Sequence, residues 1–324
     1  MALDVASSVA KSLEGCGNEI SVAWHAGEPL AMAQHDFAQL LSAFSGLVQN
    51  GRVKHVLQTN ATLLNPIWID ILMQHRVAIG VSLDGPALLN HNRVDWSGRS
   101  AFERALRGVE LLRSRDISFT AIAVIGNASL TSADAIYSFF VELGCSSLGI
   151  NFEEKVGAYE GYVTDSAGVR RFWTDLFRAW RQNPVIEVRE FNQILSWMIH
   201  ASSQPPAKAV RIEIFPCVAW NGDVVLLSPE FIGCHSVRYQ NFVVGNVLQR
   251  PLHEILANAQ TISYVNDYVR GVKRCEASCP YFSACGGLSA ANKFFETGTT
   301  DATETFYCIN STQEAINVIL EQLN

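Results

Sequence analysis

Short apolar runs rich in β-branched residues alternate with amphipathic stretches along the first half of the chain. Five runs have the composition of buried parallel strands: residues 19–24, 55–60, 77–85, 118–125 and 147–153. The stretches between them repeat apolar residues every three or four positions, which is typical of helices with one buried face: 36–49, 66–75, 101–115 and 132–144. Because strands alternating with helices form right-handed crossovers, the sequence predicts an α/β fold with a parallel sheet.

The opening stretch, residues 2–14, has the pattern of a helix, and no strand precedes it. In a barrel that begins with a strand, such a helix would follow that strand. We therefore expect a partial barrel of the (β/α)6 type that lacks its first strand.

The pattern changes in the second half of the chain. Two aromatic-rich helical stretches lead to a linker-like segment at 202–208, and Asn221–Gly222 then joins two apolar runs as in a β-hairpin. A cysteine-rich tail follows, and residues 312–323 read as a closing helix. The predicted organisation is a barrel domain, a helical linker region and a cysteine-rich domain, with boundaries at 1–155, 156–210 and 211–324.

Bulk properties narrow the function. The net charge of −7 is spread along the 324 residues, which argues against nucleic acid as a partner. No apolar run approaches the ~20 residues that span a bilayer, and the first fifteen residues lack the pattern of a secretory leader. We therefore expect a cytoplasmic protein with no membrane partner.

The tail holds the strongest chemical signal. Cys275, Cys279, Cys285 and Cys308 are separated by three, five and twenty-two residues, a spacing at which one segment can supply several thiolates to a soft metal. Gly286 would let the backbone approach such a centre closely, and so would Gly287. Spacing alone leaves an iron–sulfur cluster, a structural zinc site and unliganded thiols open.

The other four of the eight cysteines are less informative. Cys217 and Cys234 flank the predicted hairpin and could begin a second metal site, but two cysteines cannot complete one. Cys16 and Cys145 stand alone and are expected to be ordinary buried thiols.

Polar motifs follow the predicted strands: His25 to Leu30 after the first, Gln58-Thr59-Asn60 at the end of the second, and Ser82 to Pro86 at the end of the third. His91-Asn92-Arg93 comes next. Carboxyl ends of parallel strands carry the chemistry of α/β barrels. Each motif alone is weak, since Asp84-Gly85-Pro86 is also turn chemistry.

Taken with the tail, these motifs resemble the radical S-adenosylmethionine (radical SAM) enzymes that carry a C-terminal SPASM domain. Within these, the chain is most similar to the cyclophane-forming maturases, which cross-link side chains of ribosomally made precursor peptides. The resemblance rests on WHAGEPL, on the SPE-containing hairpin and on CPYFSACGGLSAANKFFETGTTDATETFYC, and it covers essentially the whole chain.

The resemblance implies roles for individual residues. Gly27, Glu28 and Pro29, in the counterpart of the family's Gly-Gly-Glu-Pro turn, would bind the amino group of S-adenosylmethionine. Gln58 or Asn60 would line the same pocket, Ser82 and Arg93 would contact its ribose and carboxylate, and Asp84 would lie near the substrate. The four tail cysteines would hold an auxiliary [4Fe–4S] cluster. A precursor peptide and an electron donor such as a small redox protein are the implied partners.

Two departures from the family pattern stand out. Ser289 replaces a further cysteine of the usual SPASM pattern, a loss common in the cyclophane-forming group. The Cys-x-x-x-Cys-x-x-Cys loop that holds the catalytic cluster does not occur, because only Cys16 precedes Cys145. The catalytic [4Fe–4S] cluster is therefore not supported by this chain.

Three readings stay open. The first is a maturase whose N-terminal segment is absent from this sequence, so that the chain as given is inactive. The second is a paralogue without the catalytic cluster that binds peptide or pairs with an active maturase. The third is an unrelated α/β protein with a structural zinc site.

Overall fold

The computed structural model describes residues 1–157, 159, 161–163, 165–203 and 212–323. The chain divides into two compact units. The first consists of Met1–Cys16, Glu154–Val163 and Ile194–Gln313. The second consists of Gly17–Glu153, Thr164–Gln193 and Glu314–Asn324. The boundaries expected from the sequence, at 155 and 210, stay a prediction, and residues 204–208 of the linker-like segment lie outside the described part of the chain.

The second unit is built on a six-stranded parallel sheet whose strands follow one another in chain order. The strands are β1 (Ile20–Trp24), β2 (Val53–Thr59), β3 (Ala78–Ser82), β4 (Phe119–Ile125), β5 (Ser147–Phe152) and β6 (Glu187–Val188). The α/β class and the five predicted strands are confirmed. β6 has only two residues, too few to produce a periodic pattern.

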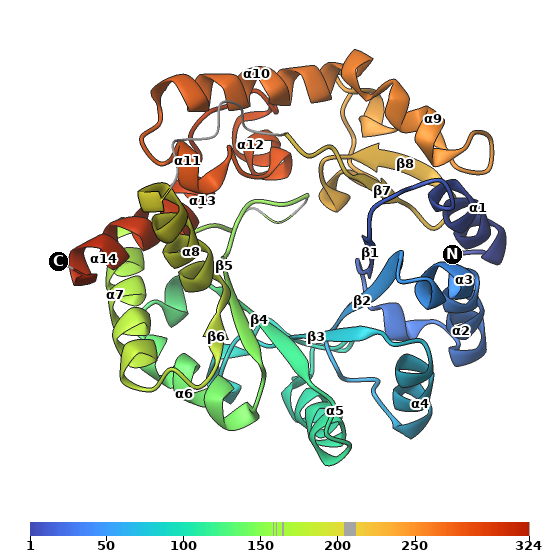
Figure 1. The fold of residues 1–324 in the computed structure, drawn as a ribbon. Coiled ribbons are helices and arrows are strands. Elements are labelled where there is room, and N and C mark those ends of the chain that lie inside the picture. The colour runs from blue at the N-terminus through green and yellow to red at the C-terminus, as the bar shows by residue number, and fades with distance from the viewer. Residues whose placement is uncertain (158, 160, 164, 204–211, 324) are drawn as a thin grey trace. The chain divides into compact units, whose positions relative to one another are not determined.

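Helices lie along the outer face of this sheet, as Figure 1 shows for α4, α5 and α6. The helices are α2 (Gln34–Ser42), α3 (Ser45–Gln49), α4 (Pro66–Gln74), α5 (Phe102–Ser114), α6 (Ala133–Leu143), α7 (Ser166–Gln182) and α14 (Glu314–Leu323). The single helix predicted at 36–49 is two helices. The break falls at Phe44, whose non-helical backbone (φ −101°, ψ 3°) carries a fully buried ring.

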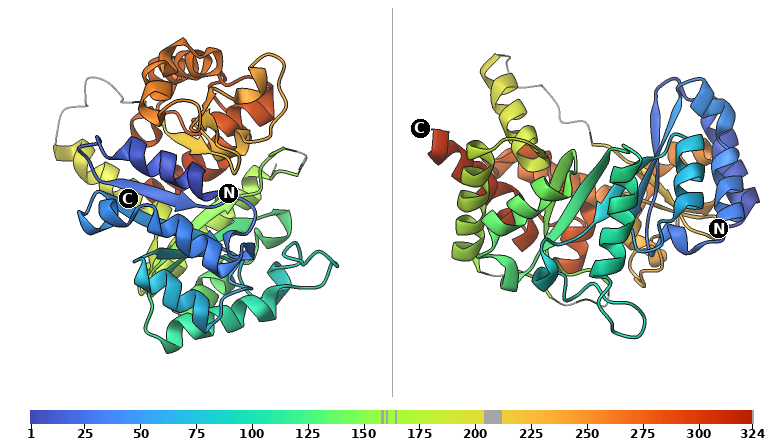
Figure 2. Two further views of the ribbon diagram at one scale, coloured as in Figure 1. Left: turned by 90° about the vertical axis from the view of Figure 1, so that its right-hand side faces the viewer. Right: turned by 90° about the horizontal axis from the view of Figure 1, so that it is seen from below.

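The first unit combines a small antiparallel sheet with helices. The predicted hairpin is confirmed as β7 (Pro216–Val218) and β8 (Asp223–Leu226), and β9 (Gly245–Asn246) pairs with β8. The longer helices are α1 (Leu3–Leu13), α9 (Leu252–Ala257), α10 (Ser263–Ser278) and α12 (Ala290–Thr297), the last two drawn in orange and red in Figure 2. α8 (Arg189–Ser203) begins in the second unit and ends in the first.

Aromatic rings form the core beside this small sheet. The rings of Phe231 and Phe242 stack with centroids 4.0 Å apart. Tyr264 lies edge-on to both, and its hydroxyl accepts a hydrogen bond from Leu226 N at 2.9 Å. This packing fixes β8 against α10, the helix that carries Cys275.

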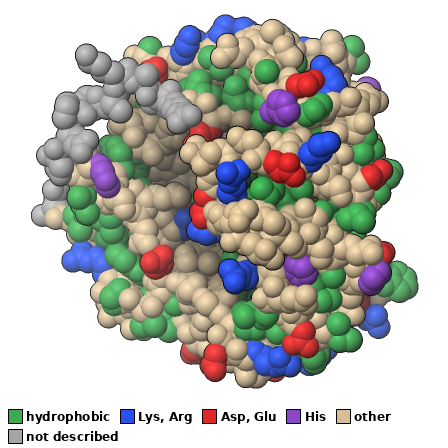
Figure 3. Space-filling model, turned by 45° about the vertical axis from the view of Figure 1, so that its right-hand side comes forward, with side chains coloured by type: hydrophobic (Ala, Val, Ile, Leu, Met, Phe, Trp, Pro, Cys, Tyr) green, Lys and Arg blue, Asp and Glu red, His purple; other side chains and the backbone are tan. Residues whose placement is uncertain are grey.

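Charges are mixed on the surface. On the face drawn in Figure 3, acidic and basic side chains are interspersed rather than gathered by sign. Within the described ranges, no helix has the length and apolar character needed to cross a membrane.

A buried histidine couples the stability of the sheet to pH. His55 on β2 is 1% exposed, and its Nδ1 accepts a hydrogen bond from Trp24 Nε1 at 3.1 Å. Burial, reinforced by the nearby His75 and opposed by a backbone hydrogen bond at Leu41, lowers the pKa of His55 to about 4. The unfolded chain, with an ordinary histidine pKa near 6.5, therefore binds more protons between pH 6.5 and 4.

We expect the free energy of unfolding to fall by up to about 3 kcal/mol as the pH drops through this window. Thermal unfolding followed by circular dichroism between pH 7.5 and 5 measures the effect. His55→Phe should flatten the profile, whereas an unchanged slope would show that His55 does not carry it.

Candidate functional site

The turn after β1 directs a carboxylate toward the end of β2. Ala26 and Gly27 both have positive φ (77° and 63°), a conformation that costs an alanine roughly 1–2 kcal/mol. Glu28 Oε1 accepts hydrogen bonds from Leu30 N (3.1 Å) and from the Thr59 hydroxyl (2.7 Å), and Oε2 accepts one from Asn60 N (2.8 Å). Glu28 therefore fixes the position of Asn60.

A second contact joins the ends of β2 and β3. Gln58 Nε2 donates to the Ser82 hydroxyl oxygen at 2.8 Å. Gly80 makes room for this crossing, because a Cβ there would lie 2.2 Å from Gln58 Oε1. Ser82 accepts in this bond, so its own hydroxyl proton remains for another acceptor.

Asp84 and Arg93 form a two-point ion pair beyond β3. Arg93 Nε donates to Asp84 Oδ2 at 2.7 Å, and Nη2 donates to Oδ1 at 2.6 Å. Val124 N at β4 also donates to Asp84 Oδ1, at 2.9 Å. Asp84 thus occupies one edge of the Arg93 guanidinium, and a carboxylate ligand would have to meet another edge.

Three of the residues predicted to bind the cofactor line one cavity of about 210 Å³: Asn60, Ser82 and Arg93. Phe102 and Ala105 of α5 contribute apolar wall. Gly27, Glu28, Pro29, Gln58 and Asp84 do not line this cavity. Glu28, Gln58 and Asp84 instead hydrogen-bond to the residues that do.

The sequence analysis missed a polar pair at the end of β6. Arg189 and Glu190 form an ion pair, Glu190 accepts from Ile150 N at 3.1 Å, and Arg189 Nη2 donates to Asn151 Oδ1 at 2.8 Å. Burial raises the pKa of Glu190, and Arg189 opposes that shift. Gly149 leaves space for the guanidinium. Both residues follow a strand directly, but β6 was too short to reveal it.

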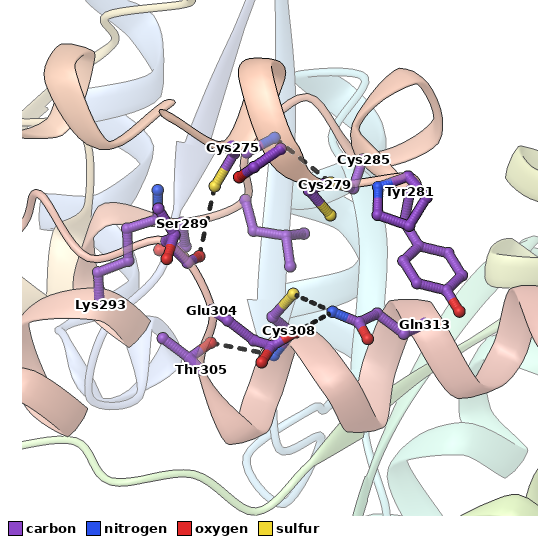
Figure 4. Close-up of a pocket in the computed structure, with 15 residues that line it drawn as sticks. Cys275, Cys279, Tyr281, Cys285, Ser289, Lys293, Glu304, Thr305, Cys308 and Gln313 are labelled. Carbon is purple, nitrogen blue, oxygen red and sulfur yellow. Dashed lines mark hydrogen bonds between the residues drawn. The ribbon is translucent and has the colours of Figure 1, made fainter. Parts of the chain in front are cut away.

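In the first unit, the four tail cysteines line one cavity of about 260 Å³ (Figure 4). Cys275 lies in the last turn of α10, Cys285 ends the short α11 (Phe282–Cys285), and Cys308 ends α13 (Phe306–Cys308). Cys279 caps α10, with its N–H donating to Cys275 O at 2.8 Å. The structure thus brings the four cysteines to one cavity, and their role as metal ligands stays a prediction.

Hydrogen-bond donors approach two of the sulfurs. Gly287 N lies 3.4 Å from Cys285 Sγ, and Gln313 Nε2 lies 3.5 Å from Cys308 Sγ. Gly287 has φ +101°, and a Cβ there would lie 2.9 Å from Val272. Only glycine therefore brings its N–H to this sulfur without strain.

The electrostatics of this cavity are unusual. Burial raises the pKa of Cys275, of Cys285 and of Cys308, the last to about 11. Lys293 also lines the cavity and is 2% exposed, and its Nζ has no hydrogen-bond partner within the described ranges. Burial lowers the pKa of Lys293, and the neighbouring cysteines oppose that shift.

No three His, Cys, Asp or Glu side chains gather as a single-ion site among the residues that the structure describes. The predicted second site at Cys217 and Cys234 thus has no third described ligand. Cys217 is half-buried, and desolvation, with a smaller contribution from the Glu230 carboxylate, raises its pKa to about 12.

Known protein structures share the fold of this chain. No family model matches the chain. The solved structure of anSMEcpe with bound AdoMet and Cp18Cys peptide covers 99% of this chain and 89% of its own, with a TM-score of 0.75 and 20% identity. The structure of Streptococcus suis SuiB bound to precursor peptide SuiA aligns with 95% of this chain, and the aligned part is 69% of the SuiB chain, with a TM-score of 0.65 and 17% identity. The fold is that of these radical SAM enzymes.

Two relatives found by sequence indicate the family of the chain. An uncharacterised protein of Synechocystis, sll1766, is 30% identical over 94% of this chain and 80% of its own length. The chain belongs to the family of this protein. The serine-type anaerobic sulfatase-maturating enzyme of Klebsiella aerogenes is 33% identical over 51% of the chain, which is 42% of that enzyme. The sulfatase-maturating relative and the structural neighbours are radical SAM enzymes that modify peptides or proteins.

The Asp84–Arg93 pair should be important for stability. Asp84→Asn would leave Arg93 without its anionic partner and weaken the contact to Val124, so we expect a loss of about 3 kcal/mol in the free energy of unfolding. Asp70→Asn is the matched control, because the pair of Asp70 and Arg115 is exposed and should contribute below about 1 kcal/mol. Urea denaturation of both variants measures the difference, and equal losses would contradict the expectation.

Proposed function

We propose that this chain is the S-adenosylmethionine-binding and auxiliary-cluster part of a maturase that modifies side chains of a ribosomally made precursor peptide. The observation that carries the proposal is the polar network joining the ends of β1, β2 and β3, which surrounds a cavity with Asn60, Ser82 and Arg93 on its wall. The relation to radical SAM enzymes speaks against the reading as an unrelated α/β protein with a structural zinc site.

The chemistry of this cavity suits S-adenosylmethionine. Ser82 offers a hydroxyl proton, and Asn60 and Arg93 offer further polar groups beside the apolar wall of Phe102. Glu28 accepts a hydrogen bond from Asn60 N, and Gln58 donates one to the Ser82 hydroxyl, so these two residues of the cavity wall are held in place. In radical SAM enzymes, S-adenosylmethionine yields a carbon radical once a separate catalytic cluster donates an electron to it; the residues of this cavity would bind and orient the cofactor.

The catalytic cluster does not fit the residues of this chain. Such a cluster requires three closely spaced cysteines. The first 216 residues contain two cysteines, Cys16 and Cys145, and these are far apart in the sequence. The proposal for these 324 residues therefore concerns the cofactor cavity and the four-cysteine cavity.

The four-cysteine cavity fits an iron–sulfur cluster better than a zinc ion. Tetrahedral zinc, with Zn–S bonds of about 2.3 Å, would hold its thiolates roughly 3.8 Å apart. The described thiols surround a cavity of about 260 Å³, yet no three of them gather as a single-ion site. A polynuclear cluster spreads its ligands more widely, and the N–H groups of Gly287 and Gln313 are donors of the kind that tune such clusters.

A peptide substrate is supported by what the structural neighbours bind. One carries the Cp18Cys peptide, and SuiB carries its precursor SuiA. Cross-linking as the particular modification, a small redox protein as electron donor and a cytoplasmic location belong to the proposal as well.

Binding of S-adenosylmethionine tests the cofactor cavity. Ser82→Ala removes the hydroxyl proton and the acceptor for Gln58, so the dissociation constant measured by calorimetry should rise roughly threefold to tenfold. Ser114→Ala, at an exposed position on α5, is the control and should bind as the unmodified chain does. Equal affinity in both variants would argue against this cavity as the binding site.

Iron content tests the four-cysteine cavity. Cys279→Ala should abolish iron binding after anaerobic reconstitution and loosen the cysteine-rich region, because metal binding and local folding are coupled. Cys16→Ala is the matched control, since Cys16 does not line the cavity and should leave the iron content unchanged. Full iron content and thermal stability in the Cys279 variant would contradict the assignment.

A further inference from the structure

Lys293 is the least explained polar group of the first unit. It lies on α12, is 2% exposed, and its Nζ has no hydrogen-bond partner among the described residues. Burying a lysine ammonium without a partner is strongly unfavourable. A sequence that keeps lysine here, rather than a methionine of similar length, must offset that cost with something else.

The neighbours of Lys293 do not supply a fixed negative charge. Its Nζ lies 5.1 Å from the centre of the Tyr268 ring, a weak electrostatic contact, and the Tyr268 hydroxyl donates to Leu288 O at 2.6 Å. Glu304 shares the cavity wall, but its Oε1 accepts from Gln313 Nε2 at 2.8 Å and no ion pair with Lys293 forms in the described part of the chain.

What surrounds Lys293 is sulfur. Cys275, Cys285 and Cys308 line the same cavity as Lys293. Figure 4 shows these cysteines and Lys293 around the cavity. Neutral thiols cannot compensate a buried cation, whereas four metal-bound thiolates give a cluster a net negative charge.

We propose that Lys293 is the charge-compensating residue of the four-cysteine cluster, which it stabilises and whose reduction potential it raises. The inference rests on the proposed iron–sulfur assignment. Reduction adds one electron to an already negative centre inside a poorly polarisable cavity, and a fixed cation nearby stabilises the reduced form more than the oxidised one. Lys293 thus acts through the cluster as a positioning and tuning residue, not as a catalytic residue.

The test compares Lys293→Met with the unmodified chain after anaerobic reconstitution. Methionine keeps the length and removes the charge. Lys273→Met is the matched control, because Lys273 is exposed on α10 two positions before Cys275 and its charge is screened by solvent. Iron and sulfide are counted for each protein. The midpoint potential is measured in an anaerobic dye titration with dithionite as the source of the electron.

We expect all three proteins to bind the same iron. At a fixed potential, the ratio of reduced to oxidised cluster should fall about tenfold in Lys293→Met, a shift of about 59 mV for a one-electron couple, and should be unchanged in Lys273→Met. A Lys293→Met cluster with the potential of the unmodified chain would overturn the proposal. Absence of iron and sulfide from the unmodified chain would instead overturn the iron–sulfur assignment.

Thermal unfolding is a second test, because Lys293→Met should change the stability of the protein in opposite directions with and without the cluster. Without metal, Lys293→Met removes an uncompensated buried charge and should raise the melting temperature. With the cluster, it removes a favourable charge pair and should reduce the stabilisation that the cluster provides.

If Lys293→Met does not retain iron, Lys293→Arg decides the matter. Iron binding restored by arginine supports a requirement for positive charge. Loss of iron in both variants would mean that the site needs the shape of lysine, and the charge proposal would fail.

Discussion

The cavity lined by Asn60, Ser82 and Arg93 depends on the hydrogen bonds that the Glu28 carboxylate accepts. It accepts three hydrogen bonds, two of which reach across from the turn after β1 to Thr59 and Asn60 at the end of β2. Parallel pairing brings the carboxyl ends of neighbouring strands to one edge of a sheet, but it does not fix the loops that follow them. Glu28 does so for the first two strands, and the Gln58–Ser82 bond and the Asp84–Arg93 pair repeat the arrangement for the next.

The four-cysteine cavity depends on a different constraint. Cys275 and Cys279 lie at the C-terminal end of the long helix α10, whereas Cys285 and Cys308 end the short helices α11 and α13, and the αL residue Gly286 caps α11. Lys293 is buried beside these thiols without a hydrogen-bond partner in the described ranges. A lysine ammonium buried beside thiols carries a desolvation cost that a negatively charged cluster held by those thiols would offset.

Much of the fold was predictable, because strands β1–β5 are rich in apolar and β-branched residues and the intervening helices repeat apolar residues at helical spacing. The position of the polar strand-end residues followed from that pattern. Their hydrogen-bond partners could not be predicted, because no sequence rule pairs Arg93 with Asp84 rather than with a ligand. Arg189 was not predicted because it follows β6, which has only two residues and gives no recognisable strand pattern. The shared cavity of the tail cysteines was predictable from spacing, whereas burial of Lys293 among them needed the packing of α12 against α10.

The central claim is that the cysteine-rich tail holds an iron–sulfur cluster. The most direct measurement is the iron, sulfide and zinc content of the full chain after purification and reconstitution without oxygen, with an absorption spectrum near 400 nm. If the tail holds a [4Fe–4S] cluster, about four iron per chain with matching sulfide are expected. About one zinc per chain and no sulfide would contradict it.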